Sequence, residues 1–400
     1  MEPYIAEHPV FGKGMEVVAY ELDFRAGFRE YCQGLETEGP AADPATFLDF
    51  AELTNGKRGV VRFPRDLLMV DFPVLFSKDM MVTGVSADLA DDEQVLRRCR
   101  FLRDHGYVIA VLGLAPAHVD LPVMELAEYG AVDFSAAPGE HKQAVVSALA
   151  RRGVQALATN LDTSEAFQEA LSLGYTLFEG EFFARPIVRP GREIAPRKLT
   201  YLRLLREVNN PALSYDEIAT LVEQDVALTY KLLKFMNSAW FGLQFKVSSV
   251  KHALVLLGPP EIRRWVSLVA VRSVAEDKPE ELLVRSLTRA KGAEQIGWAA
   301  GMQREAPELF LMGMLSLMDA LTDRPMEDVL AKLPLEEQIK TALLGGTGNY
   351  RDVFDAVVAY ERGDWNALAD LLGRFRIDDQ EIPGLMRESL TWAREALHEI

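Results

Sequence analysis

The sequence predicts an α/β barrel followed by an all-α domain. Through the first half of the 400 residues, short strand-like apolar runs alternate with segments of helical periodicity. After residue 198 the strand pattern disappears and only helical segments follow, with a proline- and arginine-rich stretch between the two halves. At roughly 100–200 residues per domain, a chain of this length is expected to hold two or three domains.

The first half contains seven strand candidates that are short, apolar and rich in β-branched or aromatic residues. They span residues 17–24, 60–63, 81–85, 107–111, 131–134, 154–158 and 175–178. Helical segments are expected at 44–53, 91–104, 121–129, 140–152 and 164–173. Alternation of this kind predicts parallel βα units, and seven strands favour a closed (β/α)₈ barrel. A doubly wound sheet is the alternative, but no strand is followed by a G-x-G-x-x-G turn.

Helix ends in this half carry their usual signals. Asp91 and Ser164 are the expected N-caps, because a short polar side chain there can accept a backbone N–H. Glycines that can adopt a left-handed conformation stand where the helices are expected to stop: Gly106, Gly130, Gly153 and Gly174.

Residues 184–198 carry three prolines and five basic residues in fifteen positions. Proline is excluded from helix interiors and removes a strand donor, so this stretch is expected to be extended. The predicted organisation is therefore a barrel at 1–188, a linker at 189–196 and a helical domain at 197–400.

The second half is expected to be a helical bundle. Ser214 and Glu217 form a capping box, and Asp225 is placed to cap the next helix. A third helix runs from Ser249 and is closed by Gly258, and a fourth begins near Pro260. Further helical segments are expected at 281–302, 307–321, 326–330, 335–344, 350–362 and 365–375.

Composition excludes several functional classes. The formal net charge is −17 and the pI about 4.9, so a phosphate backbone would be repelled and nucleic-acid binding is disfavoured. No apolar run approaches the ~20 residues of a membrane-spanning helix, and the first residues lack a signal-peptide segment. Two cysteines cannot form a disulfide framework or a zinc knuckle. These features predict a cytoplasmic protein that does not insert into membranes.

Three segments of the first half resemble EAL domains, which are cyclic di-GMP phosphodiesterases with a modified (β/α)₈ barrel. YELDFR at 20–25 is similar to the opening E-A-L-x-R strand, and LATNLDT at 157–163 to the late A-E-G-V-E-T segment. LFEGEFFARP at 177–186 is similar to the closing Q-G-Y-x-F-x-x-P and is the most specific of the three. The resemblance covers about residues 1–188.

The resemblance implies a site of two divalent metals, held by carboxylates and an Asn, beside a Lys near the attacking water. Two metals stabilise the attacking and leaving oxygens in such a displacement. Glu21 matches the first metal-binding Glu, and Asp133 keeps the Asp of the Lys-containing strand. Elsewhere other residue types stand at the family's ligand and Lys positions: Arg62, Gly84, Leu112, Gly113, Ala131 and Thr159. We therefore expect no phosphodiesterase activity, no bound metal and no cofactor.

Six residues remain as remnant ligand-binding candidates: Glu21, Arg25, Arg62, Asp133, Asp162 and Glu179. Arg25 matches the family's phosphate-binding Arg, and Arg62 adds a second guanidinium, which can pair with phosphate without a metal. The alternative for the carboxylates is that they are inherited polar groups at the barrel mouth, with Glu21 paired to Arg25 or Arg62.

The second half resembles the HDOD domain, a relative of HD-type metal phosphohydrolases that lacks their catalytic residues. The matching segments are VEQDVAL at 222–228, LLKFMNSAWF at 232–241 and VSSVKHALVLLG at 247–258. HD enzymes carry adjacent His and Asp on one helix, whereas the equivalent segment here has Ser316 and Leu317. None of the six histidines belongs to an H-x-x-H or His-Asp pair.

The tandem resemblance implies a non-catalytic signalling regulator whose partners are other proteins of unknown identity. A cyclic di-GMP receptor without hydrolysis and a divergent phosphodiesterase are the alternatives. A homo-oligomer is compatible with the sequence, which does not specify one. The candidate partner-binding residues are Trp240, Phe241 and Phe245, because aromatic anchors dominate interface energies. Alternatively, these rings close the helical core or pack against the barrel.

Overall fold

The structure is a computed structural model of the 400-residue chain. It describes residues 4–24, 50–70, 72–187, 196–209, 226–237 and 249–399, together with Glu217, Thr220, Val222, Glu223 and Val247. The chain divides into two compact units. The barrel unit comprises residues 1–185 and 359–365, and the helical unit comprises 186–358 and 366–400.

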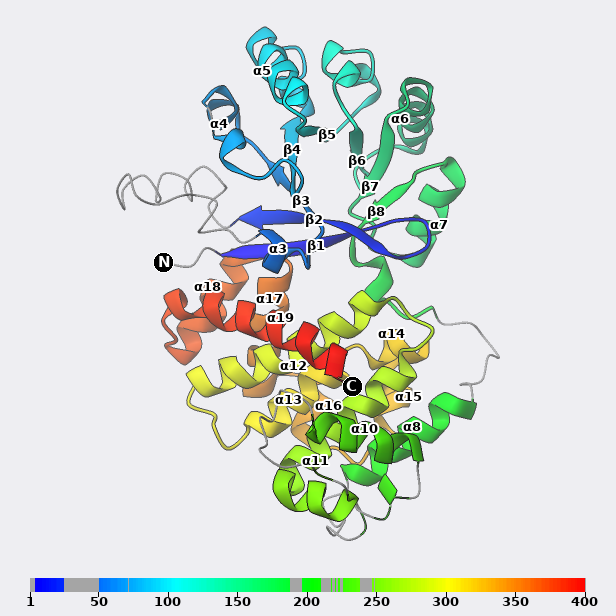
Figure 1. Ribbon diagram of the computed structural model, residues 1–400, viewed down its shortest axis with the longest axis vertical. Helices are drawn as coiled ribbons and strands as arrows, with labels where there is room; N and C mark the ends of the chain where they lie inside the picture. The colour runs from blue at the N-terminus through cyan, green and yellow to red at the C-terminus, as the bar shows by residue number, and fades with distance from the viewer. Residues whose placement is uncertain are drawn as a thin grey trace. The chain divides into compact units, whose positions relative to one another are not determined.

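Eight strands close into a barrel, in agreement with the predicted fold class (Figure 1). The first strand, β1, is antiparallel to both its neighbours, and all other adjacent strands are parallel. The strands are β1 Ile5–Phe11, β2 Val17–Phe24, β3 Arg58–Arg62, β4 Met81–Ser86, β5 Val108–Leu112, β6 Tyr129–Asp133, β7 Gln155–Thr159 and β8 Leu177–Glu179.

Strand β1 was not among the predicted strands, because Pro9 and the polar pair before it obscure its pattern. Proline cannot donate a ladder hydrogen bond. Pro9 is paired with Tyr20 of β2, whereas pairing with β8 starts only at Val10. The proline therefore stands where β1 has a strand on one side only, and the barrel closes without needing its missing donor.

Helices lie outside the strands of the barrel unit (Figure 1). They are α3 Phe50–Leu53, α4 Arg65–Met69, α5 Glu93–Asp104, α6 Gly139–Arg152 and α7 Ser164–Leu173. Gly153 and Gly174 end α6 and α7 in the left-handed conformation, as predicted.

Two local predictions in this unit were wrong. The expected helix at 121–129 is only a 3₁₀ turn over Pro122–Glu125, and Gly130 lies inside β6. Four residues starting with a proline are too few for a cooperative α-helix. The N-caps are Asp92 and Thr163, each one residue from the predicted position. Asp92 accepts the N–H groups of Gln94 and Val95, and Thr163 accepts the N–H of Ala166.

The helical unit follows the predicted all-α pattern, with α11 broken where a helix end was expected. Gly258 has φ 74° and ψ 164°, outside helical geometry, inside the span Val250–Val274. Ser249 caps this helix by accepting the His252 N–H. The unit's described helices are α8 Pro196–Val208, α10 Val226–Met236, α11 Val250–Val274, α12 Glu280–Ala299, α13 Ala306–Leu315, α14 Met318–Thr322, α15 Met326–Leu330, α16 Glu337–Leu343, α17 Asn349–Glu361, α18 Trp365–Phe375 and α19 Ile382–Glu399.

Helix α19 lies beyond the last predicted helical segment, 365–375, and was not predicted. The predicted segment 307–321 is two helices, since Leu317 leaves helical geometry between α13 and α14. Most of the predicted capping box and the Asp225 cap lie outside the described residues. None of the described helices combines the length and the apolar character required to cross a membrane.

Asn237, in the LLKFMNSAWF segment at 232–241, has a structural role. Its side-chain amide donates to the carbonyls of Leu233 at 2.6 Å and Val247 at 2.8 Å. Its Oδ1 accepts the Val247 N–H at 2.8 Å. One side chain therefore connects the end of α10 to Val247, two residues before the Ser249 cap of α11.

We expect Asn237→Ala to lower the free energy of unfolding by about 1–2 kcal/mol, because three hydrogen bonds to backbone groups are lost. Asn237→Asp should be only partly tolerated, since it keeps the acceptor and loses both donors. Urea denaturation of the full chain measures both values, with the exposed Lys234→Ala on the same helix as control. An unchanged midpoint for Asn237→Ala would contradict this role.

Candidate functional site

The candidate site is the carboxyl-terminal mouth of the barrel. A layer of apolar side chains fills the interior, including Val60, Val82, Ala110, Ala131 and Leu157. Side chains alternate along a strand, so the residue two positions further on also faces inward. These mouth positions are Glu21, Arg62, Gly84, Leu112, Asp133, Thr159 and Glu179. The structure thus brings together five of the six predicted candidates, counting Asp162 just beyond β7, while Arg25 lies outside the described residues.

Glu179 and Glu21 form an acidic pair at this mouth. Glu179 is only 9% exposed and accepts the Asn160 N–H at 3.0 Å. Burial raises the pKa of Glu179 to about 8, and the nearby Glu21 carboxylate adds to the effect. Burial also raises the pKa of Glu21, while the charge of Arg62 opposes the shift. At neutral pH the pair therefore retains a proton.

Arg62 supplies the positive charge at the mouth. It ends β3 with an exposed side chain, and the charge of its guanidinium opposes the rise that burial causes in the pKa of Glu21. A guanidinium remains protonated in proteins and has no lone pair to offer a cation. Arg62 can bind a phosphate or a carboxylate, but it cannot be a metal ligand.

Asp133 and Asn160 organise the loops above the mouth. Asp133 accepts from the Ser135 hydroxyl at 2.8 Å and from the N–H groups of Ser135 and Ala136. Although burial opposes it, these bonds and one from the Asn160 side chain lower the pKa of Asp133. Asn160, with φ 58°, therefore connects Asp133 to Glu179. Sequence reasoning missed Asn160, although an Asn directly after a strand tolerates this left-handed conformation.

Gly84 and Leu112 give one side of the mouth an apolar surface. A Cβ at Gly84 would lie 2.8 Å from Leu112 Cδ1 and 2.9 Å from the Val61 carbonyl oxygen. The side chain of Leu112 thus occupies the space that a residue larger than glycine at position 84 would need. Neither residue offers an oxygen ligand to a cation.

The residues at this mouth do not fit a two-metal centre. Within the described residues, no three His, Cys, Asp or Glu side chains are gathered as a possible metal site. A hard divalent cation needs several oxygen ligands. Besides Glu21, Asp133 and Glu179, the mouth presents the Arg62 guanidinium and the apolar pair Gly84 and Leu112, which offer no oxygen ligand.

In the helical unit, a buried arginine lies beside Ser316, which stands where HD enzymes carry the His of their His-Asp pair. Arg289 is 5% exposed and Ser316 is 8% exposed, and the Arg289 guanidinium lies 3.4 Å from the Ser316 hydroxyl. Arg289 also stacks over the Phe354 ring at 5.7 Å. The guanidinium is a fixed charge, so a metal ion beside Ser316 would be repelled.

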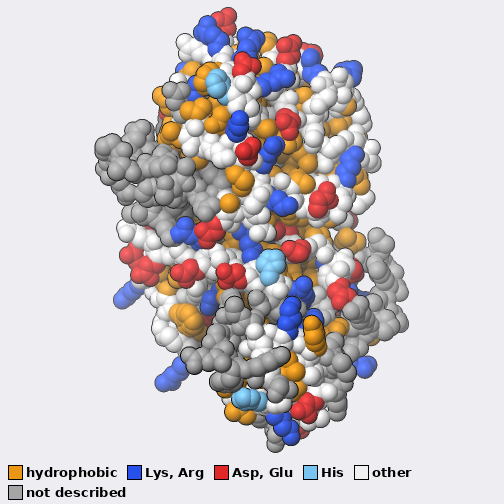
Figure 2. Space-filling view, viewed as in Figure 1, with side chains coloured by type: hydrophobic (Ala, Val, Ile, Leu, Met, Phe, Trp, Pro, Cys, Tyr) orange, Lys and Arg blue, Asp and Glu red, His pale blue; other side chains and the backbone are white. Residues whose placement is uncertain are grey.

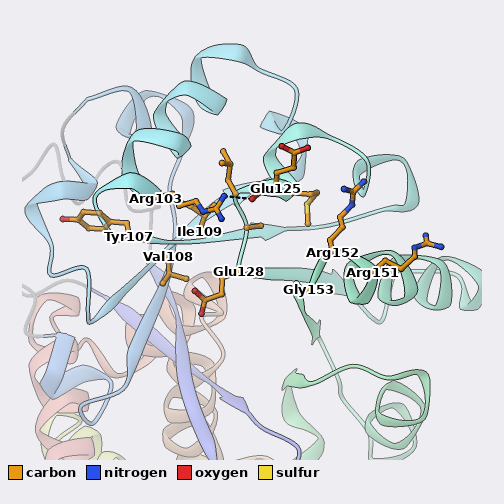
Figure 3. A pocket seen from close by; sticks show the side chains of 12 residues that line it. Arg103, Tyr107, Val108, Ile109, Glu125, Glu128, Arg151, Arg152 and Gly153 are labelled. Carbon is orange, nitrogen blue, oxygen red and sulfur yellow. Dashed lines mark hydrogen bonds between the residues drawn. The ribbon is translucent and has the colours of Figure 1, made fainter.

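A groove of about 630 Å³ lies at the opposite end of the barrel (Figure 3). It is lined by residues at the starts of β5 and β6 and by Arg103, Arg151 and Arg152 from the ends of α5 and α6. Arg103 donates to the Glu125 carbonyl at 2.6 Å, and Arg152 pairs with Asp120 at 2.7 Å. Basic residues in a last helical turn complement the helix dipole, which accounts for these arginines without a ligand.

Comparison with known families finds a match in the first part of the helical half. The model of the HDOD domain matches residues 196–322. Residues 196–322 form an HDOD domain. The predicted HDOD resemblance is therefore confirmed, and Asn237 and Arg289 are residues of this domain. The remaining helices α15 to α19 lie beyond the match.

Two curated proteins are similar over almost the whole chain. The uncharacterized protein YuxH of Bacillus subtilis is 27% identical over 409 residues, which cover 99% of both proteins. The cyclic di-GMP phosphodiesterase CdgJ of Vibrio cholerae is 28% identical over 410 residues, 98% of this chain and 92% of CdgJ.

Solved EAL-domain structures are similar to part of the chain. The phosphodiesterase PaMucR in complex with c-di-GMP is 12% identical with a TM-score of 0.37, over 46% of this chain and 97% of PaMucR. The EAL-domain protein YkuI of Bacillus subtilis, bound to c-di-GMP and calcium, is 16% identical with a TM-score of 0.36, over 56% of this chain and 72% of YkuI.

The acidic pair predicts a specific pH dependence. Folding favours the protonated form of Glu179. The contribution of Glu179 to the free energy of unfolding therefore falls as pH rises from about 4.5 to about 8, and it no longer changes above pH 8. Across this pH range we expect the wild type to lose on the order of 2–4 kcal/mol of unfolding free energy through Glu179, and Glu179→Gln to lack this loss. Denaturant unfolding at several pH values measures it, with the exposed Glu165→Gln as control. Parallel pH profiles for wild type and Glu179→Gln would contradict the raised pKa.

The apolar side of the mouth predicts a coupled pair. We expect Gly84→Ala to destabilise the barrel by about 1–3 kcal/mol, because the added methyl group collides with Leu112. Leu112→Ala in the same chain should recover part of this loss, although the contact with the Val61 carbonyl remains. A double-mutant cycle from chemical denaturation measures the coupling. Strict additivity would show that the two positions do not compete for space.

Proposed function

We propose that this chain is a non-catalytic regulator in cyclic di-GMP-related signalling that acts through contacts with other proteins. The observation that carries the proposal is the mouth of the barrel, where Arg62, Gly84 and Leu112 stand at inward-facing strand positions. In-line phosphodiester hydrolysis by two metals requires oxygen ligands at such a mouth. The full-length similarity to CdgJ supports the link to cyclic di-GMP.

Distribution of charge on the surface is compatible with protein partners. Figure 2 shows Lys and Arg side chains interspersed with Asp and Glu on the face in view. A net charge of −17 opposes binding to a nucleic-acid backbone. Mixed charges of this kind instead give specificity and orientation in protein contacts.

Binding of cyclic di-GMP without hydrolysis is the second candidate function. It is favoured by Arg62, whose exposed guanidinium can pair with a phosphate without a metal. Hydrolysis is the competing function, because CdgJ bears the name of a phosphodiesterase. These three functions differ in whether the nucleotide binds and whether it is cleaved.

We expect the purified chain to leave cyclic di-GMP intact in Mg²⁺ or Mn²⁺, as measured by chromatography of the linear dinucleotide product. Metal-dependent turnover that disappears in Glu21→Ala, but persists in the control Glu165→Gln, would contradict the proposal. Calorimetric titration with cyclic di-GMP then separates the two non-catalytic functions. Heat of binding that Arg62→Ala abolishes, without turnover, would identify a receptor.

A further inference from the structure

A small hollow with an apolar floor opens between α8 and α15 of the helical unit. Its volume is about 260 Å³, and its floor includes Leu202, Val329 and Leu333. Val329 and Leu333 are buried, whereas Leu202 is half-buried. The hollow therefore offers an apolar surface that none of the described residues fills.

Positive charge surrounds this floor. Arg203 and Lys332 are exposed lining residues, and neither side chain forms a hydrogen bond or ion pair with another described residue. Arg324 and Arg206, the latter ion-paired with Glu207, also line the hollow, and Asp328 is the one carboxylate of the lining. Four basic side chains against one acidic side chain contrast with the net charge of −17 of the whole chain. A local potential of this sign attracts carboxylates.

The loop that carries Arg324 is held in place before any ligand arrives. Asp323 has φ 54° and accepts from Lys278 at 2.7 Å and from the Ile187 N–H at 3.0 Å. The Arg324 N–H donates to the Asp319 carbonyl at 3.1 Å. A preorganised rim lowers the ordering cost of binding.

The size of the hollow indicates what fits. A cavity of about 150 Å³ accepts a benzene-sized group, whereas small-molecule pockets usually span roughly 300–1,000 Å³. One large apolar side chain therefore fits here, and a dinucleotide does not. We propose that this hollow, the α8–α15 pocket, is a docking site for an acidic peptide segment of a partner protein. The segment inserts one large apolar side chain between flanking carboxylates that pair with Arg203 and Lys332.

This inference deepens the proposed function, since it identifies one surface through which a partner would be recognised. Its test uses the full chain and a capped, fluorescein-labelled peptide with two glutamates on each side of a central leucine. Two further peptides replace the leucine by serine or the four glutamates by glutamines. Fluorescence anisotropy measures the affinity of each peptide.

We expect the glutamate–leucine peptide to bind and each altered peptide to bind at least about tenfold more weakly. Arg203→Glu and Lys332→Glu should each weaken binding about fivefold, and Lys251→Glu, an exposed reversal on α11, should not. Raising the salt from about 0.05 M to about 0.5 M should weaken binding as well. Circular-dichroism melts confirm that the exposed variants remain folded.

Three results would overturn the proposal. The first is no binding of the glutamate–leucine peptide, and the second is equal binding of the serine peptide, which would reduce the site to a charge attraction. The third is self-association of the chain in sedimentation velocity that Arg203→Glu abolishes, which would make a second copy the occupant. Cyclic di-GMP turnover is measured in parallel on Arg203→Glu. Turnover would contradict the proposed function, whereas absence of peptide binding without turnover would contradict only the pocket.

Discussion

Closure of the barrel is the constraint that determines its chemistry. Once eight strands close, every second side chain faces inward, and only the last inward position of each strand reaches the mouth. The carboxylates, the guanidinium and the apolar pair are therefore neighbours because of strand register, although they are spread over more than 150 positions of sequence from Glu21 to Glu179. A shift of one residue in the register of any one strand would turn the mouth residue of that strand outward.

Electrostatics at the mouth follows from burial rather than from the number of charges. Glu179 is enclosed and close to another acid, so it holds its proton, whereas Asp133 receives several hydrogen bonds and remains ionised. Two carboxyl groups at one end of a barrel thus behave differently because their donors differ. Asn160 donates to both acids, so a substitution at this position would change the hydrogen bonding of Asp133 and of Glu179.

Much of the fold follows from sequence patterns, while the details depend on tertiary contacts. The strand and helix alternation was sufficient to predict a barrel, and Gly258 marked the break in α11. Strand β1 was not predicted because proline is unfavourable in strands. The barrel tolerates Pro9 because this residue pairs with β2 only, and pairing with β8 begins at Val10. For the site, Glu21, Arg62 and Glu179 were found by motif, but their coupling and the role of Asn160 arise only from the folded barrel. The aromatic candidates Trp240, Phe241 and Phe245 lie outside the described residues.

The segment Ala359–Trp365 belongs to the barrel unit although it lies far along the chain. The rings of Tyr360 and Trp365 lie 5.9 and 5.6 Å from that of Tyr4, and 5.5 Å from each other. Truncation after the proline-rich stretch would therefore remove two of three packed rings from the barrel and leave them without Tyr4 in the remaining fragment. Gene rearrangements that exchange one half of this chain for an unrelated domain would carry the same penalty, so the two halves are expected to be inherited together.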